Sequence, residues 1–512
     1  MEKRTLIAVV LSIMILVGWQ YFFQPKPVPQ QPAPIEKTEP AAKALPETAL
    51  SEPATQIPGQ PPLAADSTGS DVTVETDLYK AVFSTKGAIV KSWQLKKHID
   101  KDGMPVVLLK EPGSVPSMGM LFESGDRNLP QNLIYTASKD GLMLSKNGIS
   151  TGEIIFDYTV QGISIRKKLA FYNDDYKIAL SIETINAPSY LLAVGTNFGV
   201  FDKEQKEHKG PVLLIDSSRK EFDDKLKETQ LLTGYIGWIA QEDKYFTAAL
   251  APLTKIESAK VWKEGETAEI ALKVSSQKQD FLFYAGPKEY DGLKKLNVGL
   301  EHIIDFGWFS IVAMPLFWVL KFFYKYLGNY GWTIILLTII TRIPFIPLMH
   351  KSQQSMKKMQ TIQPMLASIK EQFKKDPQKM QKEMSELYKK HKVNPVGGCL
   401  PMLLQIPVFI ALYNVLSKAI ELRGAPFIFW IHDLSMKDPY YILPVVMGAS
   451  MVIQQKMTPS TMDPTQAKIM MIMPIVFTFM FLSFPSGLVI YWFVNNILGI
   501  AQQLYANKKA EA

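Results

Sequence analysis

The sequence is short of cysteine and of catalytic signatures. Cys399 is the only cysteine among 512 residues, so any soluble domain must fold without an internal disulfide. The zinc-protease, serine-hydrolase, P-loop and dinucleotide-binding motifs are missing, and the six histidines lie far apart in the sequence. These absences predict a protein that is not an enzyme, has no local metal motif and needs no cofactor.

Acidic residues are missing from the middle of the long apolar segments. Mean hydropathy is +0.03 for the whole chain, but apolar residues concentrate near the N-terminus and beyond Phe306. Away from their ends, the apolar segments of the C-terminal half contain no Asp or Glu. Five of them reach or approach the roughly 20 residues that cross a bilayer as a helix, at 331–349, 395–422, 440–457, 469–484 and 486–505.

Two further segments belong to the membrane part. Residues 1–23 join a basic start to an apolar run with an aromatic end and no small-residue cleavage site, which indicates an uncleaved transmembrane signal anchor. Residues 301–326 are aromatic and carry few charges, which favours an amphipathic helix in the membrane interface. The predicted order is an anchor (1–23), a Pro-rich flexible linker (24–70), a β domain (71–300), the interfacial helix (301–326), a helical core (327–505) and a tail (506–512).

The segment 71–300 has the pattern of β-strands. Short runs alternate apolar and polar residues, for example at 79–83 and 89–93. The dipeptide Asn147-Gly148 predicts a tight hairpin turn, since both turn positions need a positive φ. About 230 residues with this pattern predict one large β-sandwich.

The basic residues lie beside the apolar segments. The net charge is +8, and the loop 350–393 alone holds eleven lysines and four acidic residues, a net charge of +7. Positively charged loops stay on the cytoplasmic side of a bacterial inner membrane, so both termini are expected in the cytoplasm and the β domain in the periplasm. Lysines in these positions suit anionic lipid headgroups, and no nucleic-acid readout is expected.

Arg342 is the most informative residue, because it lies near the middle of the apolar segment 331–349. An arginine there costs between about 3 and 17 kcal/mol unless it meets water or a polar partner. It could lie in a hydrated, positively charged groove that attracts the acidic or polar tail of a chain being inserted, or it could snorkel to an interface or cap a helix carbonyl. Its candidate polar neighbours are Thr338, Thr341, Gln405, Asn414, Gln454, Asn495 and Asn496.

The basic loop is itself expected to form a helical hairpin over 351–392. Apolar residues recur every three or four positions, and Asp376 followed by Pro377 is typical of a helix N-terminus. One interpretation is a lipid-headgroup-binding amphipathic hairpin; the other is a landing surface for ribosomes or nascent chains, since methionine side chains adapt to varied partners. The candidate contact residues are Met356, Lys357, Lys358, Met380 and Met384.

Several longer motifs resemble those of the bacterial YidC/Oxa/Alb insertase family. They follow one another in the same order as in the family, at 393–401 (VNPVGGCLP), 422–427 (LRGAPF), 430–435 (WIHDLS), 438–444 (DPYYILP) and 484–488 (FPSGL). The resemblance covers about 306–505, and the N-terminal part is similar to the Gram-negative form of the family. It implies a multi-pass α-helical protein of the bacterial inner membrane, with a five-helix core bundle, an N-terminal anchor helix and a large all-β periplasmic β-supersandwich domain.

The same resemblance implies a membrane protein insertase and chaperone. Its expected partners are nascent membrane proteins, the phospholipid bilayer, the ribosome, SecYEG and accessory Sec proteins. By motif position, Arg342 is similar to the groove arginine of the family, Thr338 to a neighbouring substrate contact, and Tyr491-Trp492 to an aromatic pair on the last span. Trp492 stands where some relatives have a second tyrosine. Gln405, Asn414 and Asn495 complete the predicted groove.

Two other protein classes compete with this interpretation. An ion-coupled transporter would usually place Asp, Glu or His in its spans to bind the coupling ion, and the acid-free apolar segments argue against it. A membrane-anchored periplasmic enzyme acting on carbohydrate would suit a large β-sandwich. Such an enzyme needs one anchor, which would leave five further apolar segments without a purpose.

Overall fold

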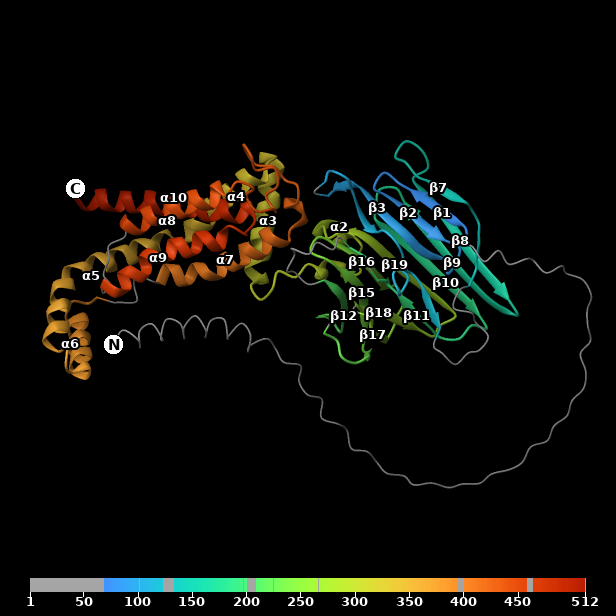
Figure 1. The fold of residues 1–512 in the computed structure, drawn as a ribbon, viewed down its shortest axis with the longest axis horizontal. Coiled ribbons are helices and arrows are strands. Elements are labelled where there is room, and N and C mark those ends of the chain that lie inside the picture. The colour runs from blue at the N-terminus through green and yellow to red at the C-terminus, as the bar shows by residue number, and fades with distance from the viewer. Residues whose placement is uncertain are drawn as a thin grey trace, which may run out of the picture. The chain divides into compact units, whose positions relative to one another are not determined.

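The computed structural model describes a β domain followed by a bundle of helices, which confirms the predicted fold class (Figure 1). The predicted anchor at 1–23, the linker up to residue 68 and Cys399 lie outside the described residues. The described residues are 69–100, 102–122, 133–196, 198–199, 209–223, 225–265, 267–393, 400–457 and 464–511.

Three sheets make up the β domain. Successive side chains of a strand point to opposite faces, so a strand with one buried face alternates apolar and polar residues. In β2 (Tyr79–Ser84), Tyr79, Ala81 and Phe83 are buried while Lys80 is exposed. The first sheet has the order β4-β3-β2-β1-β7, with β1 (Asp71–Glu75), β3 (Ile89–Ile99), β4 (Pro105–Leu109) and β7 (Gly141–Met143).

The second sheet is the largest, and all its strand pairs are antiparallel. Its order is β13-β12-β15-β16-β19-β10-β9-β8-β6. Its strands are β6 (Thr136–Ala137), β8 (Thr151–Val160), β9 (Ile163–Tyr172), β10 (Lys177–Ile185), β12 (Gly210–Ile215), β13 (Ser218–Glu221), β15 (Ile236–Glu242), β16 (Phe246–Pro252) and β19 (Lys278–Pro287). The third sheet has the order β14-β17-β18-β11-β5, with β5 (Met120–Phe122), β11 (Tyr190–Ala193), β14 (Gln230–Thr233), β17 (Ser258–Glu264) and β18 (Thr267–Val274).

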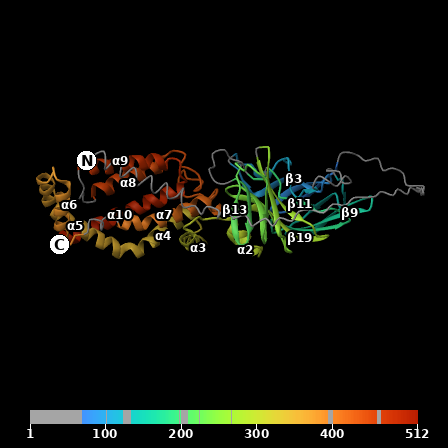
Figure 2. The ribbon, with the colours of Figure 1, turned by 90° about the horizontal axis from the view of Figure 1, so that it is seen from below.

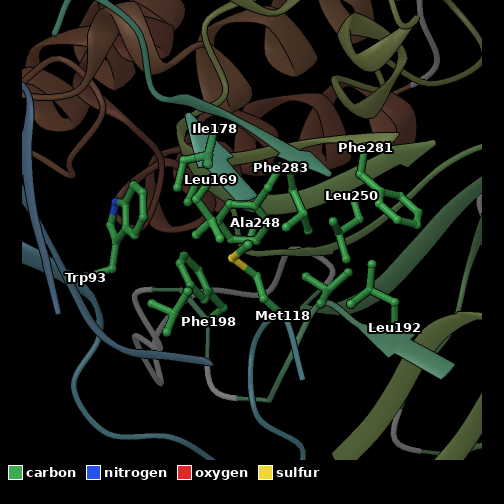
Figure 3. Packing of buried hydrophobic residues seen from close by; sticks show 14 of the residues in the cluster. Trp93, Met118, Leu169, Ile178, Leu192, Phe198, Ala248, Leu250, Phe281 and Phe283 are labelled. Atoms are coloured by element: carbon green, nitrogen blue, oxygen red, sulfur yellow. The ribbon is translucent and has the colours of Figure 1, made fainter. Parts of the chain in front are cut away.

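One apolar core joins the three sheets. Trp93 of the first sheet, Leu169 of the second and Leu192 of the third belong to the same buried cluster (Figure 3). The rings of Trp93 and Phe283 lie 6.1 Å apart and nearly perpendicular, a favourable arrangement for an aromatic pair. Since each large apolar side chain contributes about 1.5–3 kcal/mol on burial, a core of this extent stabilises the domain without a disulfide.

The other face of the nine-stranded sheet is covered by α2 (Tyr290–Lys295) and η1 (Leu300–Ile303). Trp238 of β15 points to this side, whereas the next residue, Ile239, belongs to the main core. Trp238 Nε1 donates a hydrogen bond to the carbonyl oxygen of Gly299 at 3.0 Å. The central sheet is therefore covered on both faces here, so the β domain is more than the two-layer sandwich that strand periodicity predicts.

The prediction of a β-hairpin at Asn147-Gly148 is wrong. Gly148 N donates to the carbonyl oxygen of Ser145 at 3.2 Å, so a tight turn is present, but neither Asn147 nor Gly148 has a positive φ. The flanking strands belong to different sheets, because β7 pairs with β1 and β8 pairs with β9. Long-range pairing, which a local turn signal does not contain, decided the partners of both strands.

The helical bundle follows the β domain in sequence. Helices α4, α7, α8 and α10 run alongside one another in both views (Figure 1, Figure 2). Their interior is apolar and includes Ile334, Leu412, Met447 and Leu488. The helices are α3 (Ser310–Leu327), α4 (Tyr330–Arg342), η2 (Ile343–Phe345), α5 (Ile346–Gln372), α6 (Pro377–Lys390), α7 (Leu400–Lys418), η4 (Ile420–Leu422), α8 (Ile442–Met457), α9 (Pro464–Phe481) and α10 (Ser486–Glu511).

The span predicted at 331–349 and the hairpin predicted at 351–392 share one long helical run, Tyr330–Gln372. Pro344 has no N–H, and the short η2 turn accommodates it between α4 and α5. Among the described residues, this run and Ser310–Leu327 are long and apolar enough to cross a membrane by length and composition; Ile442–Met457 and Met471–Phe481 are shorter apolar helices. The interfacial role of 301–326 stays a prediction.

Lys167 occupies a core position of β9 and is fully buried. Its Nζ donates to the carbonyl oxygens of Gly87, Ala88 and Met118 at 3.0, 3.2 and 2.9 Å. These three residues all have positive φ, so their turns direct the carbonyls at the ammonium group. Lys167 therefore ties two turns to the central sheet through neutral acceptors.

Replacing Lys167 by methionine is expected to destabilise the β domain by about 2–4 kcal/mol, because buried carbonyls lose their donor. Urea unfolding of the detergent-solubilised protein measures the effect, with hydrogen exchange of β9 peptides as the signal. The matched control is Lys168→Met, which removes an exposed ion pair to Glu153 and should change stability by less than about 1 kcal/mol. Equal stability of the two variants would contradict the role given to Lys167.

A second buried ionisable group lies in the third sheet. Glu269 of β18 is 0% exposed, and Thr267 Oγ1 donates to its Oε1 at 2.9 Å. Burial raises the pKa of Glu269 to about 7, although the hydrogen bond from Thr267 acts in the opposite direction. The folded protein therefore holds a proton on this carboxyl group at pH values where the unfolded chain has lost it.

The free energy of unfolding should accordingly fall as pH rises from 4.5, the ordinary pKa of Glu, to about 7. The loss is at most about 3 kcal/mol, since each pKa unit corresponds to about 1.4 kcal/mol. Glu269→Gln should flatten this pH dependence and stabilise the domain above pH 7, whereas Glu228→Gln at an exposed position should keep the wild-type slope. Urea titrations between pH 5 and 8 test this, and a wild-type slope in Glu269→Gln would refute it.

Candidate functional site

Helix α4 carries Arg342 at its C-terminal end, and contacts at its N-terminus fix its position. Asn329 Oδ1 accepts from the backbone N–H groups of Gly331 and Trp332 at 2.9 and 3.2 Å, as an N-cap does. Asn329 Nδ2 donates to the carbonyl oxygen of Pro426 at 3.2 Å. A side chain at Gly331 would overlap the ring of Phe427, so glycine allows α4 to pack against this loop. These contacts set where Arg342 lies along the bundle.

Arg342 is half-buried and faces α10. Its Nη1 donates to the backbone carbonyl oxygen of Asn495 and, at 3.2 Å, to Oδ1 of the same residue. Helices α4, α7, α8 and α9 contain no Asp or Glu, and α10 has only Glu511 at its last residue. The guanidinium thus meets neutral acceptors and keeps its full positive charge, and the predicted neighbour Asn495 is brought to it.

Tyr491 lies one helical turn before Asn495 on α10 and is 2% exposed. Its hydroxyl is hydrogen-bonded to the side chain of Gln405, and it lies close enough to Arg342 to interact with its charge. Thr338 lies one turn before Arg342 and is buried, with its hydroxyl donating to the carbonyl oxygen of Ile334 at 2.7 Å. Substrate contact through Thr338 stays a prediction.

Trp492 follows Tyr491 but belongs to a different set of contacts. Consecutive residues of a helix point about 100° apart, which separates the two side chains. The Trp492 ring lies 4.8, 5.8 and 5.2 Å from the rings of Phe409, Phe477 and Phe481. The predicted aromatic pair therefore divides into a tyrosine beside the cation and a tryptophan within an apolar cluster of α7, α9 and α10.

Asn414 and Asn496 have partners other than Arg342. Asn414 Nδ2 donates to the carbonyl oxygen of Phe306 at 2.8 Å, which ties α7 to the segment before α3. Asn496 Nδ2 donates to Ser450 Oγ at 3.0 Å and links α10 to α8. The described hydrogen bond of Asn414 is to Phe306 and not to Arg342. A role for Asn414 in a groove stays a prediction.

The hairpin of α5 and α6 has its own small core. Met359, Ile362 and Leu366 of α5 are buried, and Met384 and Leu387 of α6 pack against them. Asp376 Oδ1 accepts from the backbone N–H of Lys379 at 3.1 Å, which confirms the predicted helix N-terminus. Of the predicted contact residues, Lys358 is exposed, and four are half-buried: Met356, Lys357, Met380 and Met384.

Gly499 is a residue that sequence reasoning missed. A Cβ atom there would lie 3.2 Å from Arg342 Nη2 and 2.5 Å from Gln454 Nε2, so the missing side chain leaves room for both groups. The signal for it was available: Tyr491, Asn495 and Gly499 are spaced four residues apart and so share one face of α10. Ser450, the partner of Asn496, carried no comparable signal.

Among the residues that the structure describes, no group of three or more His, Cys, Asp or Glu side chains could hold a metal ion. The site brings together one cation, a tyrosine, neutral amides and an aromatic cluster. Such a set can attract a carboxylate or polar group and pack against apolar side chains.

Two family models match the chain in succession. The model described as the YidC periplasmic domain matches residues 71–319, and the model described as the 60Kd inner membrane protein matches residues 322–512. The boundary between the two matches, at residues 319–322, lies within α3.

Known proteins are similar over the full length. The chain is 42% identical to the membrane protein insertase YidC of Geotalea daltonii, with 100% of both chains covered. It is 42% identical to the YidC of Citrifermentans bemidjiense over 99% of both chains, and 44% identical to that of Geobacter sp. over 100% of both.

Solved structures are more distant. A crystal structure of an active YidC insertase is 20% identical, with a TM-score of 0.38, covering 83% of this chain and 90% of that one. A galactose mutarotase related enzyme from Lactobacillus acidophilus is 11% identical with a TM-score of 0.28, covering 42% of this chain and 97% of that one. Scores this low carry no inference about activity. The full-length sequence identities and the two matched models show that the chain belongs to the YidC membrane protein insertase family.

Proposed function

We propose that this protein inserts segments of nascent membrane proteins into a bacterial inner membrane and assists their folding, acting through Arg342 and without covalent chemistry. The observation that carries the proposal is a half-buried arginine on α4 whose described hydrogen-bond acceptors are neutral. Its charge stays available to a partner, because α4, α7, α8 and α9 contain no Asp or Glu and α10 has only Glu511 at its last residue.

The proposed path begins in a hydrated groove between the helices. Water around Arg342 shortens the hydrocarbon distance that the polar tail of a substrate must cross, and the guanidinium offers acidic groups on that tail a favourable charge. Tyr491, which lies beside the cation, and Gln405, which is hydrogen-bonded to Tyr491, extend the polar side of this path.

The apolar part of a substrate then leaves for the lipid along the aromatic side chains around Trp492. The driving free energy is hydrophobic transfer at about 25 cal/mol per Å² of apolar surface. No nucleotide hydrolysis is needed, because the transfer of about 20 apolar residues from water into lipid is itself favourable.

The hairpin of α5 and α6 is proposed to face the cytoplasm, because the loop 350–393 has a net charge of +7. In this orientation both termini are cytoplasmic, the β domain is periplasmic, and the predicted anchor with five core spans gives six passes. The exposed Lys358 and the adaptable, half-buried Met356 and Met380 suit a surface for ribosomes, nascent chains or lipid headgroups, whereas Met384 packs in the core of the hairpin. SecYEG and accessory Sec proteins are proposed partners on the basis of family membership.

Substitution of Arg342 tests the charge step. In cells depleted of the wild-type protein, Arg342→Ala and Arg342→Glu should reduce insertion of a small acidic-tailed substrate about tenfold, the effect of losing roughly 1.4 kcal/mol of attraction. Arg342→Lys should support insertion, because it keeps the charge. Protease protection of the substrate tail measures the result.

Two controls accompany this test. Lys456→Ala removes an exposed cation at the end of α8 and should leave insertion unchanged. A substrate with a neutral tail should be inserted equally well by all Arg342 variants. Normal insertion of the acidic-tailed substrate by all three variants would show that the charge of Arg342 is not used.

A further inference from the structure

In the proposed function, Arg342 must be held in place before a substrate binds to it. Both of its described acceptors belong to Asn495: the backbone carbonyl oxygen, and Oδ1 at 3.2 Å. In an α-helix, a carbonyl oxygen accepts the N–H of the residue four positions on, here Gly499. Arg342 therefore shares an oxygen that the helix already uses.

The surface of α10 is shaped for this contact. The Cβ of any other residue at 499 would lie 3.2 Å from Arg342 Nη2, closer than side chains normally approach. The same Cβ would lie 2.5 Å from Gln454 Nε2 of α8. The glycine leaves an open place one turn beyond Asn495, and the guanidinium lies in it.

The acceptors at Asn495 are polar but uncharged. A hydrogen bond from a guanidinium to a carboxylate is shorter and roughly twice as strong as one to a neutral group, and it is often bidentate. A carboxylate on an entering segment can therefore displace Asn495, whereas a carboxylate fixed at position 495 would hold the cation permanently.

We infer that Asn495 is a positioning residue that holds Arg342 at rest, and that its neutrality leaves the cation free to transfer to a carboxylate of the entering segment. The inference rests on the proposed function and deepens it, because it assigns Asn495 to the resting state of the arginine and not to substrate contact.

Substitutions at 495 that differ in charge but little in size separate these roles. Asn495→Asp should reduce insertion of an acidic-tailed substrate about tenfold, close to the loss in Arg342→Ala, because the new ion pair occupies the guanidinium. Insertion of the same substrate with a neutral tail should stay unchanged. Asn495→Gln should insert the acidic-tailed substrate within about twofold of wild type, since it keeps a neutral acceptor and leaves the cation free.

The measurement is protease protection in depleted cells complemented with each full-length variant, with Arg342→Ala in parallel. Equal loss for both tails in Asn495→Asp would show a structural role and overturn the inference. Normal insertion of the acidic tail by Asn495→Asp, together with failure of Arg342→Ala, would overturn the inference and leave the proposed charge step standing. Normal insertion of the acidic tail by Arg342→Ala would remove the charge step, and the inference with it.

Discussion

A guanidinium inside an apolar helical bundle needs polar partners, because each donor left unpaired among apolar side chains costs free energy. In this protein, α10 provides two acceptor oxygens of Asn495, and the missing side chain of Gly499 leaves room for the guanidinium. The N-cap at Asn329 and the close packing of Gly331 hold α4 so that Arg342 meets them. Contacts from α4 and α10 thus meet at one cation and its neutral partners.

The β domain also contains a buried basic side chain. Lys167 is buried in its core, and three backbone carbonyls surround the ammonium group. Both side chains donate to neutral acceptors, and burial lowers the pKa of Lys167 to about 7. The difference lies in access: Lys167 is fully enclosed by β-structure, whereas Arg342 is half-buried. The enclosed Lys167 ties strands and turns together, whereas part of the Arg342 side chain stays accessible.

The aromatic residues of α10 show how one helix can serve two environments. Tyr491 and Trp492 are neighbours in sequence, yet one lies beside Arg342 and the other packs among Phe409, Phe477 and Phe481. The helical rotation between consecutive residues separates a polar side of the helix from an apolar one.

Local patterns were sufficient for much of the fold. Alternation predicted strands in 71–300, apolar length predicted the helices after it, and Asp376-Pro377 predicted the start of α6, because each signal acts within a few residues. The midspan position of Arg342 and the absence of acids on facing segments were also visible in the sequence, since burial of charge is costly wherever the helix packs. Only the tertiary structure decided which strands pair across three sheets, that Asn147-Gly148 joins no hairpin, and that Asn495 and Gly499 face Arg342 while Asn414 bonds elsewhere. Those outcomes depend on contacts between residues far apart in the chain, whose geometry no local pattern contains.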